Sequence, residues 1–318
     1  MHIGCGCVNI GSASANATRR DHVRLVRDAF DAGITRFDTA DVYGRGESER
    51  IVGRALRDVR DEVTISTKGG YRTRPRSAAE QSARRAVARL RSRRPGAHRP
   101  APVTTATGHD PAKDFDPAWL RSALDASLQR LGTDHVDVYH LHGPPQVIDG
   151  LILELDDLRR AGKVRRFGIG AETLAAARAW VDSGEPDVVQ LPVGVLDPDG
   201  LDVVARAPEG MAMWARGALG GGVLAAAMRD PAGVADHPKR AMIEQLVAVA
   251  DDAGIGVDEL SLRWLGAQRR IDTVLVGISS PSHVRRNVEL AAMPPLSDDV
   301  LAAIEAVIGD AAATEDRT

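Results

Sequence analysis

Four residues in this chain have side chains that could together transfer a proton. Asp38 and Tyr43 lie in the stretch FDTADVYG, Lys68 ends the run TISTK and His142 ends the run VYHLH. A tyrosine hydroxyl has a pKa of about 10, so it is a weak acid near neutrality, and a nearby cation stabilises its phenolate. Lys68 can supply that cation, Asp38 can pair with a buried lysine, and His142 can orient a substrate oxygen. The set predicts a site that protonates a substrate.

Each of these residues also has an ordinary structural explanation. Asp38 could cap a helix, and Lys68 could form a strand-end ion pair. His142 could be a core histidine or a partner of His140, and Tyr43 could cover the edge of the core. The chemical hypothesis therefore requires that the fold bring all four to one place.

Short apolar runs rich in β-branched residues alternate with helical patterns. The predicted strands are 2–10, 35–40, 62–68, 135–142, 164–171, 187–193, 210–215 and 272–278. The predicted helices are 22–33, 48–59, 117–132, 147–162, 172–184, 199–208, 243–254, 257–268 and 282–293. Alternation of this kind predicts parallel strands with crossover helices, as an open doubly wound sheet or as a closed barrel.

Eight repeats without a change in composition favour one α/β domain over residues 1–318, a (β/α)8 TIM barrel with extra helices. A dinucleotide-binding open sheet needs a G-x-G-x-x-G turn after its first strand, whereas Gly4-Cys5-Gly6 lies inside the strand. In such a barrel the active site lies at the carboxyl ends of the strands, where the four residues above are expected.

One long arginine-rich loop follows the third predicted strand and interrupts the alternation. This insert covers residues 72–114, and its part 72–103 holds ten arginines and one acidic residue. It is too long for a simple connection. Its middle, 78–94, could be a short basic helix. A solvated surface insert is one interpretation, and a lid that recognises an anionic substrate is the other.

The overall composition excludes several classes of partner. With 41 basic and 44 acidic residues, the net charge of −3 gives no general attraction to nucleic acid or to an anionic membrane. The two cysteines, Cys5 and Cys7, are too few for a disulfide framework and are expected to be inward-facing small apolar residues. We expect a cytoplasmic protein that acts on a small molecule. His140-x-His142 has no third ligand at a recognisable interval, so no metal is expected.

Several motifs together resemble one enzyme family. The stretch GITRFDTADVYGRGESERIVGRAL resembles the signature of the aldo-keto reductases. TISTKGG, LRSALDASLQRLGTDHVDVYHLHGP and VLVGISSPSHVRRNVELA are similar to further family blocks in the expected order, and the resemblance extends from residue 2 to about 309. It implies a (β/α)8 barrel and NAD(P)H-dependent interconversion of a carbonyl and an alcohol. Asp38, Tyr43, Lys68 and His142 match the catalytic tetrad, with Tyr43 as the general acid.

The resemblance also implies a cofactor site. Gln190 matches the residue that holds the nicotinamide carboxamide, and Arg216 falls where a planar group stacks on the nicotinamide. The residues matched to the phosphate and adenine site are Gly277, Ser279, Ser280, His283, Arg286 and Asn287. A glycine and serines before a helix offer backbone N–H groups and a positive dipole to a phosphate. NADPH is the expected cofactor because His283, Arg285 and Arg286 could contact a 2′-phosphate, and NADH is the alternative.

The chain departs from the family pattern at three places. Gly170 and Ala171 replace a usual Ser-Asn pair that contacts the carboxamide, for which Glu172 or a water could compensate. His283 stands where many NADP-using members have an arginine. The hairpin that closes the barrel floor is expected to be absent or minimal, because the chain starts almost at the first strand.

The sequence therefore predicts a reductase of an aldehyde or a ketone. One alternative is a cofactor-binding regulatory barrel without turnover, which the missing Ser-Asn pair favours. Another is a related enzyme that reduces a conjugated double bond or isomerises a sugar or a secondary metabolite. The sequence leaves the substrate and the oligomeric state open.

Overall fold

The structure is a computed structural model that describes residues 2–11, 18–72, 112–229 and 231–315. The predicted helix within 78–94 and the predicted lid lie outside these residues.

Eight parallel strands close into a barrel in chain order, which confirms the expected (β/α)8 fold. The strands are β1 (His2–Gly6), β2 (Arg36–Asp38), β3 (Thr64–Gly69), β4 (Val136–His142), β5 (Val164–Gly170), β6 (Val188–Pro192), β7 (Ala212–Arg216) and β8 (Thr273–Gly277). β8 pairs with β1 and completes the circle. Since all strands are parallel, their carboxyl ends meet at one end of the barrel.

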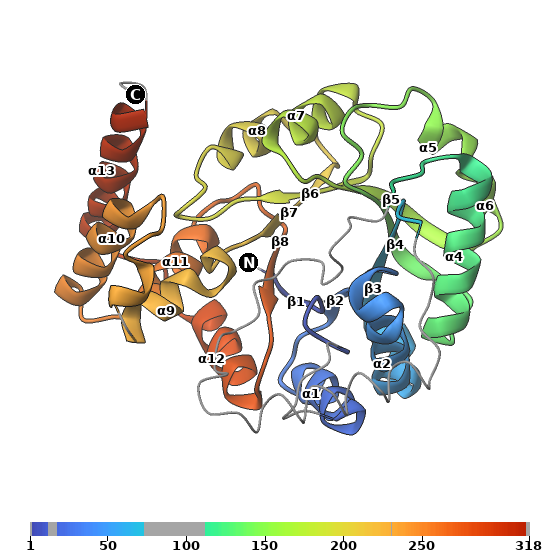
Figure 1. Ribbon diagram of the computed structural model, residues 1–318, viewed down its shortest axis with the longest axis horizontal. Helices are drawn as coiled ribbons and strands as arrows, with labels where there is room; N and C mark the ends of the chain where they lie inside the picture. The colour runs from blue at the N-terminus through green and yellow to red at the C-terminus, as the bar shows by residue number, and fades with distance from the viewer. Residues whose placement is uncertain (1, 12–17, 73–111, 230, 316–318) are drawn as a thin grey trace.

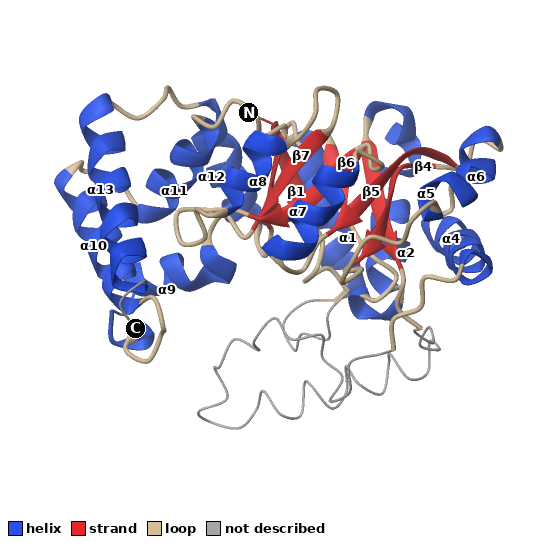
Figure 2. Ribbon diagram, turned by 90° about the horizontal axis from the view of Figure 1, so that it is seen from above, coloured by secondary structure: helices blue, strands red, loops and turns tan. Residues whose placement is uncertain are grey.

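Helices surround this barrel, as Figures 1 and 2 show. They are α1 (Arg19–Asp31), α2 (Glu47–Leu56), α4 (Pro117–Leu131), α5 (Leu151–Glu154), α6 (Asp156–Arg160), α7 (Leu174–Ser183), α8 (Gly200–Arg206), α9 (Val223–Arg229), α10 (Arg240–Asp252), α11 (Val257–Gly266), α12 (Pro281–Ala292) and α13 (Asp298–Glu315). Short 3₁₀ turns occur at η1 (Tyr43–Arg45), η2 (Arg57–Glu62), η3 (Gly220–Gly222) and η4 (Pro231–Val234). α10 and α13 pack side by side at one flank of the molecule (Figure 1).

The prediction of a single helix over 147–162 is wrong. The segment forms α5 and α6, which meet at Leu155, whose φ of −88° and ψ of 1° depart from helical geometry. Gly150, with a φ of +74°, also turns the chain immediately before α5. The apolar spacing is the same in one long helix and in two short ones, so the pattern could not reveal the break.

Strand alternation divides the side chains into an inner and an outer layer. A Cβ placed on Gly4 would lie 2.7 Å from Leu275, so Gly4 faces the barrel interior. The interior apolar cluster consists of Val138, Val188, Ala212, Trp214 and Leu275. Successive residues of a strand point to opposite faces. Odd and even positions of β1 therefore have different neighbours.

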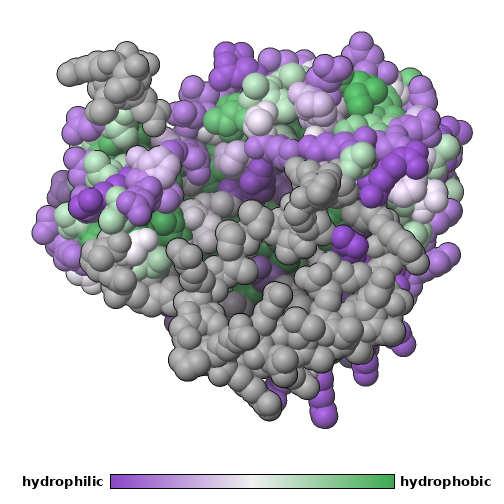
Figure 3. Space-filling model, viewed as in Figure 1, coloured by the Kyte–Doolittle hydropathy of each residue, from purple (hydrophilic) through white to green (hydrophobic). Residues whose placement is uncertain are grey.

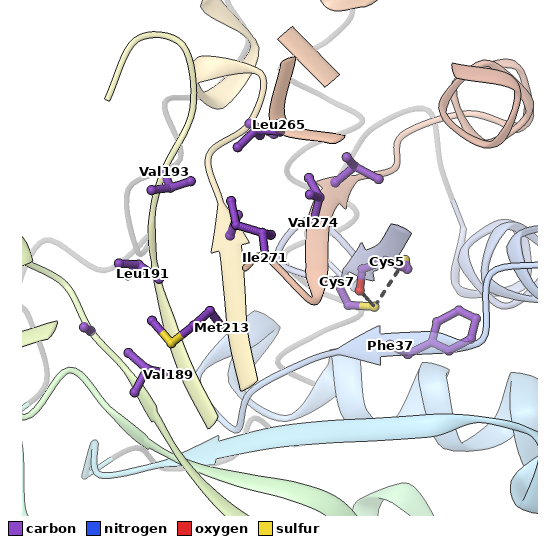
Figure 4. Close-up of a cluster of buried hydrophobic side chains, with 14 of the residues drawn as sticks. Cys5, Cys7, Phe37, Val189, Leu191, Val193, Met213, Leu265, Ile271 and Val274 are labelled. Carbon is purple, nitrogen blue, oxygen red and sulfur yellow. Dashed lines mark hydrogen bonds between the residues drawn. The ribbon is translucent and has the colours of Figure 1, made fainter. Parts of the chain in front are cut away.

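Cys5 and Cys7 were expected to face inward, but they do not point into the barrel. Both are 0% exposed and belong to the large cluster between the strands and the helices, together with Phe37 (Figure 4). Their Sγ atoms lie 3.6 Å apart. The alternation that places Gly4 inside places Cys5 outside. The sequence prediction failed because strand parity and residue size alone do not show which face of the strand points into the barrel.

The surface and the helices agree with a molecule that buries its apolar side chains internally. On the part of the described surface that is visible in Figure 3, hydrophilic residues lie between and around the hydrophobic areas. Within the described residues, no helix combines the length and the apolar character that a membrane crossing requires.

We predict that Gly53→Ala destabilises the fold. Gly53 lies in α2 where this helix crosses the end of α4, and an added Cβ would be 1.8 Å from the carbonyl oxygen of Leu131. The atom that obstructs it belongs to the backbone, so relief requires a shift of a whole helix, at a cost of about 1–3 kcal/mol. Urea denaturation measures the change.

Gly309→Ala is the matched control, because Gly309 is also helical and an added Cβ meets nothing within 4 Å. Its expected effect is neutral, or stabilising by roughly 0.5–1 kcal/mol. Equal effects of the two substitutions would show that α2 and α4 are not in such close contact.

Candidate active site

A buried ion pair occupies the carboxyl end of the barrel. The Lys68 side chain is 1% exposed, and its Nζ donates to Asp38 Oδ2 and, at 2.9 Å, to the Thr39 carbonyl oxygen. Ser66 Oγ donates to Asp38 Oδ1 at 2.6 Å. Burial is the largest single influence on Lys68 and would lower its pKa, but the charges of Asp38 and Tyr43 and the hydrogen bonds to them together outweigh burial, and the pKa is raised. Lys68 is therefore a permanent cation.

Tyr43 lies directly against this cation. It begins the 3₁₀ turn η1, and the ammonium nitrogen of Lys68 is 5.1 Å from its ring centroid. Desolvation raises the pKa of the Tyr43 hydroxyl, whereas the charge of Lys68 and a hydrogen bond from it act in the opposite direction. The hydroxyl therefore keeps its proton near neutrality and faces a group that would stabilise the phenolate.

His142 completes the group. Its ring meets Tyr43 edge-on, with 6.1 Å between the centroids. Burial, followed by the charges of Lys68 and Lys113, lowers the pKa of His142 well below its ordinary value. A neutral imidazole next to a tyrosine hydroxyl can donate a hydrogen bond to an uncharged substrate oxygen. The structure thus brings together Asp38, Tyr43, Lys68 and His142.

The two residues that replace the Ser-Asn pair border a buried amide. Gln190 lies in the middle of β6 and is 3% exposed, and its Nε2 has no hydrogen-bond partner in the described part of the chain. A Cβ on Gly170 would lie 3.6 Å from Gln190 Oε1, so a side chain could be accommodated there. Arg216 donates to the carbonyl oxygen of Ala171 at 2.8 Å. This part of the site therefore offers the unsatisfied amide donor of Gln190 and the planar cation of Arg216.

A second group beside His142 was not found from the sequence. Tyr71 donates its hydroxyl hydrogen to Glu172 Oε1 at 2.6 Å, and Lys113 Nζ donates to Glu172 Oε2 at 2.6 Å. Tyr71 and Lys113 form an antiparallel bridge across the two ends of the insert. Both oxygens of Glu172 thus already accept a hydrogen bond. Nothing in the residue pattern indicates the pairing of Tyr71 with Lys113.

The turn between β8 and α12 holds the remaining predicted residues, with Gly277 at the end of the strand. Ser280 caps α12 and accepts a hydrogen bond from the His283 backbone N–H at 3.2 Å, and Ser279 Oγ lies 2.7 Å from His283 Nδ1. Asn287 is 6% exposed one turn further on. Serines and backbone N–H groups thus gather at a helix amino terminus.

Arg286 is placed differently from the expectation that it faces a phosphate. Its guanidinium donates to Glu259 at 3.0 Å and to Asp258 at 3.5 Å, both on α11. Arg285 is exposed. Successive helix positions point in different directions, and only the neighbouring helix, which the local sequence does not identify, shows which arginine is already paired.

Two buried groups adjoin the site without belonging to the tetrad. His140 is 0% exposed and packs 5.5 Å from the Trp214 ring, and burial lowers the pKa of His140 to about 3. Asp41 is 5% exposed, and burial together with the nearby charge of Glu49 raises the pKa of Asp41 to about 8. Both groups are therefore uncharged near neutrality. Among the described residues, no cluster of three or more His, Cys, Asp or Glu side chains could hold a metal ion.

Comparison with known proteins identifies the family. The Aldo/keto reductase family pattern matches residues 2–309, nearly the whole chain. The chain belongs to the aldo/keto reductase family. It is thus a member of a family of oxidoreductases with this barrel fold.

Relatives of this aldo/keto reductase cover nearly its full length. It is 26% identical to L-galactose dehydrogenase of Arabidopsis thaliana, over 96% of this chain and 90% of that protein. The holo form of an aldo-keto reductase of Bacillus halodurans superposes with a TM-score of 0.75 at 23% identity, over 96% of this chain and 91% of the other. An aldo/keto reductase of Klebsiella pneumoniae, solved with NADP and acetate, gives a TM-score of 0.64 at 23% identity, over 96% and 90% of the two chains.

We predict that Asp41→Asn stabilises this reductase as the pH rises. The carboxyl of Asp41 stays protonated in the folded state up to about pH 8, whereas in the unfolded chain it ionises at about pH 4. A carboxyl with a raised pKa stabilises the fold below the unfolded value and loses that contribution as the pH rises towards the folded value. Asparagine has no such dependence. The variant should therefore gain melting temperature relative to wild type between about pH 5 and 8.

The exposed Asp61 provides the control. Asp61→Asn should follow the wild-type melting temperature at every pH. A constant difference between Asp41→Asn and wild type across this range would show that Asp41 is ionised in the folded protein.

Proposed function

We propose that this aldo/keto reductase reduces an aldehyde or a ketone to an alcohol with NADPH. The observation that carries the proposal is that the Lys68 ammonium contacts both the Asp38 carboxylate and the Tyr43 ring, and that the His142 ring meets Tyr43 edge-on. This arrangement holds a neutral hydroxyl next to a fixed positive charge, which is what proton donation to a carbonyl oxygen requires.

The proposed reaction transfers a hydride and a proton to the carbonyl group of the substrate. When bound, a nicotinamide cofactor would supply a hydride to the carbonyl carbon. Tyr43 gives its hydroxyl proton to the carbonyl oxygen, so an alcohol forms and a phenolate is left. Lys68 stabilises that phenolate until a proton from solvent restores it. His142 donates a hydrogen bond that orients the carbonyl oxygen, and Asp38 keeps Lys68 charged and in place.

The described residues fit a nicotinamide cofactor. The buried amide nitrogen of Gln190 has no hydrogen-bond partner among the described residues, and a carboxamide oxygen is a natural acceptor for it. The amino terminus of α12, with Ser279 and Ser280, suits a phosphate group. The complex of the Klebsiella pneumoniae structure with NADP is in line with this assignment. The absence of the Ser-Asn pair should weaken the nicotinamide contacts by roughly 1–2 kcal/mol.

The preference for NADPH rests on the start of α12. His283 and Arg285 are both exposed there, and a 2′-phosphate binds best to charged, multidentate donors. Arg286 is already paired with Asp258 and Glu259. Most of the arginine-rich insert, which suggests an anionic substrate, lies outside the described residues, so an anionic substrate stays a prediction from the sequence. The two cysteines suit a reducing cytoplasm, where we place the protein.

We predict that Tyr43→Phe lowers kcat for carbonyl reduction on the order of 100-fold or more. The substitution removes the proton donor and keeps the ring that contacts His142. The affinity for NADPH should stay unchanged. Turnover is measured with the best substrate from a carbonyl screen by NADPH absorbance, and cofactor affinity by fluorescence titration.

Tyr139→Phe is a suitable control, because the hydroxyl of Tyr139 is buried against the Leu120 carbonyl oxygen on the outer side of the same strand as His142. It should reduce stability and leave turnover unchanged. Wild-type turnover in folded Tyr43→Phe would remove Tyr43 from the role of acid.

We predict that Arg285→Ala raises the Kd for NADPH by roughly 10-fold and leaves the Kd for NADH unchanged, because the loss of a charge-assisted hydrogen bond to the 2′-phosphate affects only NADPH. Arg286→Ala should change the NADPH affinity less, since Arg286 is engaged by acids of α11. Titration of both cofactors measures the effect. Tighter binding of NADH than of NADPH by the wild type would contradict the choice of cofactor.

A further inference from the structure

The orientation of His142 depends on packing. Its Nδ1 is buried and has no hydrogen-bond partner within the described chain. Two tyrosine rings contact the imidazole edge-on, Tyr43 at 6.1 Å and Tyr71 at 4.9 Å between centroids. A histidine normally has one ring nitrogen fixed by a hydrogen bond, which sets its orientation. Here the nearer ring, that of Tyr71, has to supply most of this constraint.

Tyr71 is itself held in place by its hydroxyl. The residue is 4% exposed, and it donates to Glu172 Oε1 at 2.6 Å. Tyr71 follows β3 and Glu172 follows β5, so the hydrogen bond extends over the end of β4, where His142 lies. A rotation of the Tyr71 ring would break this bond. The imidazole therefore packs against a surface that cannot easily turn.

Lys113 fixes the carboxylate and the backbone at the same time. Its Nζ donates to Glu172 Oε2 at 2.6 Å and to the carbonyl oxygen of Gly143, the residue after His142, at 2.8 Å. Gly143 has a φ of +67°, and an added Cβ would lie 2.4 Å from Glu172 Oε1. Only glycine permits this close approach. Lys113 also lies 5.3 Å above the Tyr71 ring centroid, a cation–π distance.

We propose that Tyr71, Lys113 and Glu172 form a positioning clamp that orients His142 towards the carbonyl oxygen. The assignment rests on the proposed function of His142. The three residues come from three separate segments around the end of β4, and together they restrain both the ring and the following peptide group. The clamp residues are not expected to touch the reacting atoms, so they act through His142.

The clamp also connects the two ends of the arginine-rich insert to the active site. The Arg72 N–H donates to the Ala112 carbonyl oxygen at 2.8 Å, and the Asp114 N–H donates to the Gly70 carbonyl oxygen at 2.6 Å. These bonds hold Tyr71 and Lys113 opposite each other in an antiparallel bridge. Because of these bonds, both ends of the insert meet the barrel immediately next to His142.

Two substitutions test the clamp. Tyr71→Phe removes the anchoring hydroxyl and keeps the ring, and Lys113→Met removes the ammonium and keeps the length of the side chain. Each should lower kcat on the order of 10-fold, with little change in KM for NADPH, because a small misplacement of an orienting group lowers the rate more than it lowers binding. The double variant should be little worse than the worse single variant, since both break one chain of contacts.

An additional readout follows His142 directly and does not need turnover. The charged and titratable groups that face His142 are Lys68, Lys113, Arg216, His140, Tyr43, Tyr71 and Glu172. Because the charge of Lys113 lowers the pKa of His142, Lys113→Met should raise that pKa, measured from the imidazole NMR signals of the full chain. Lys113→Arg keeps the charge and should restore both the kcat and the titration towards wild type.

Lys163→Met is the matched control. Lys163 forms a comparable ion pair with Asp125 at 2.7 Å, before the start of β5 at the opposite end of the barrel. It should leave kcat and the His142 titration unchanged. Wild-type kcat and an unshifted titration in folded Lys113→Met would overturn the clamp. If no carbonyl compound is reduced by the wild type while Lys113→Met still shifts the titration, the proposed function fails and the clamp on His142 stands.

Discussion

The structure depends on one buried charge. The ammonium of Lys68 lies inside the barrel at 1% exposure, a position that is strongly unfavourable for an unpaired charge. The neighbouring strand supplies the compensation through Asp38, and the Thr39 carbonyl oxygen accepts a further hydrogen bond. The parallel register places Asp38 level with Ser66, two residues before Lys68 on β3. The pairing of β2 with β3 thus brings the neutralising carboxylate to the cation.

Space for these polar side chains comes from glycines in neighbouring strands. On β5 the inward positions 168 and 170 are both glycine, and a Cβ on Gly168 would lie 2.4 Å from His140 Nδ1. The interior therefore holds large side chains on β4 and β7, among them Trp214, and none at these positions of β5. The same substitution that deprives the chain of Ser-Asn contacts keeps the region around Gln190 open.

The sequence was sufficient to predict the architecture and the proximity of the four central residues, because both depend on local patterns. Alternating apolar runs specify the strands, and barrel closure brings strand ends together irrespective of their separation in sequence. Other features depend on which segments become neighbours. Arg286 pairs with acids of another helix, and Tyr71 meets Lys113 across a long insert. The layer that receives Cys5 and the break at Leu155 are decided by packing, which residue type and periodicity leave undetermined. The helices α9 and α13 were not predicted from the sequence.

Because Cys5 and Cys7 point outward from the barrel, they can report transient separation of the helices from the strands. They are the two cysteines of the chain, and both are 0% exposed between the barrel and its helices. A thiol reacts as the exposed thiolate, so an alkylating reagent reaches them only when the helical shell separates from the strands. The rate of labelling therefore reports how readily the helical shell opens in the native protein. No engineered probe is required.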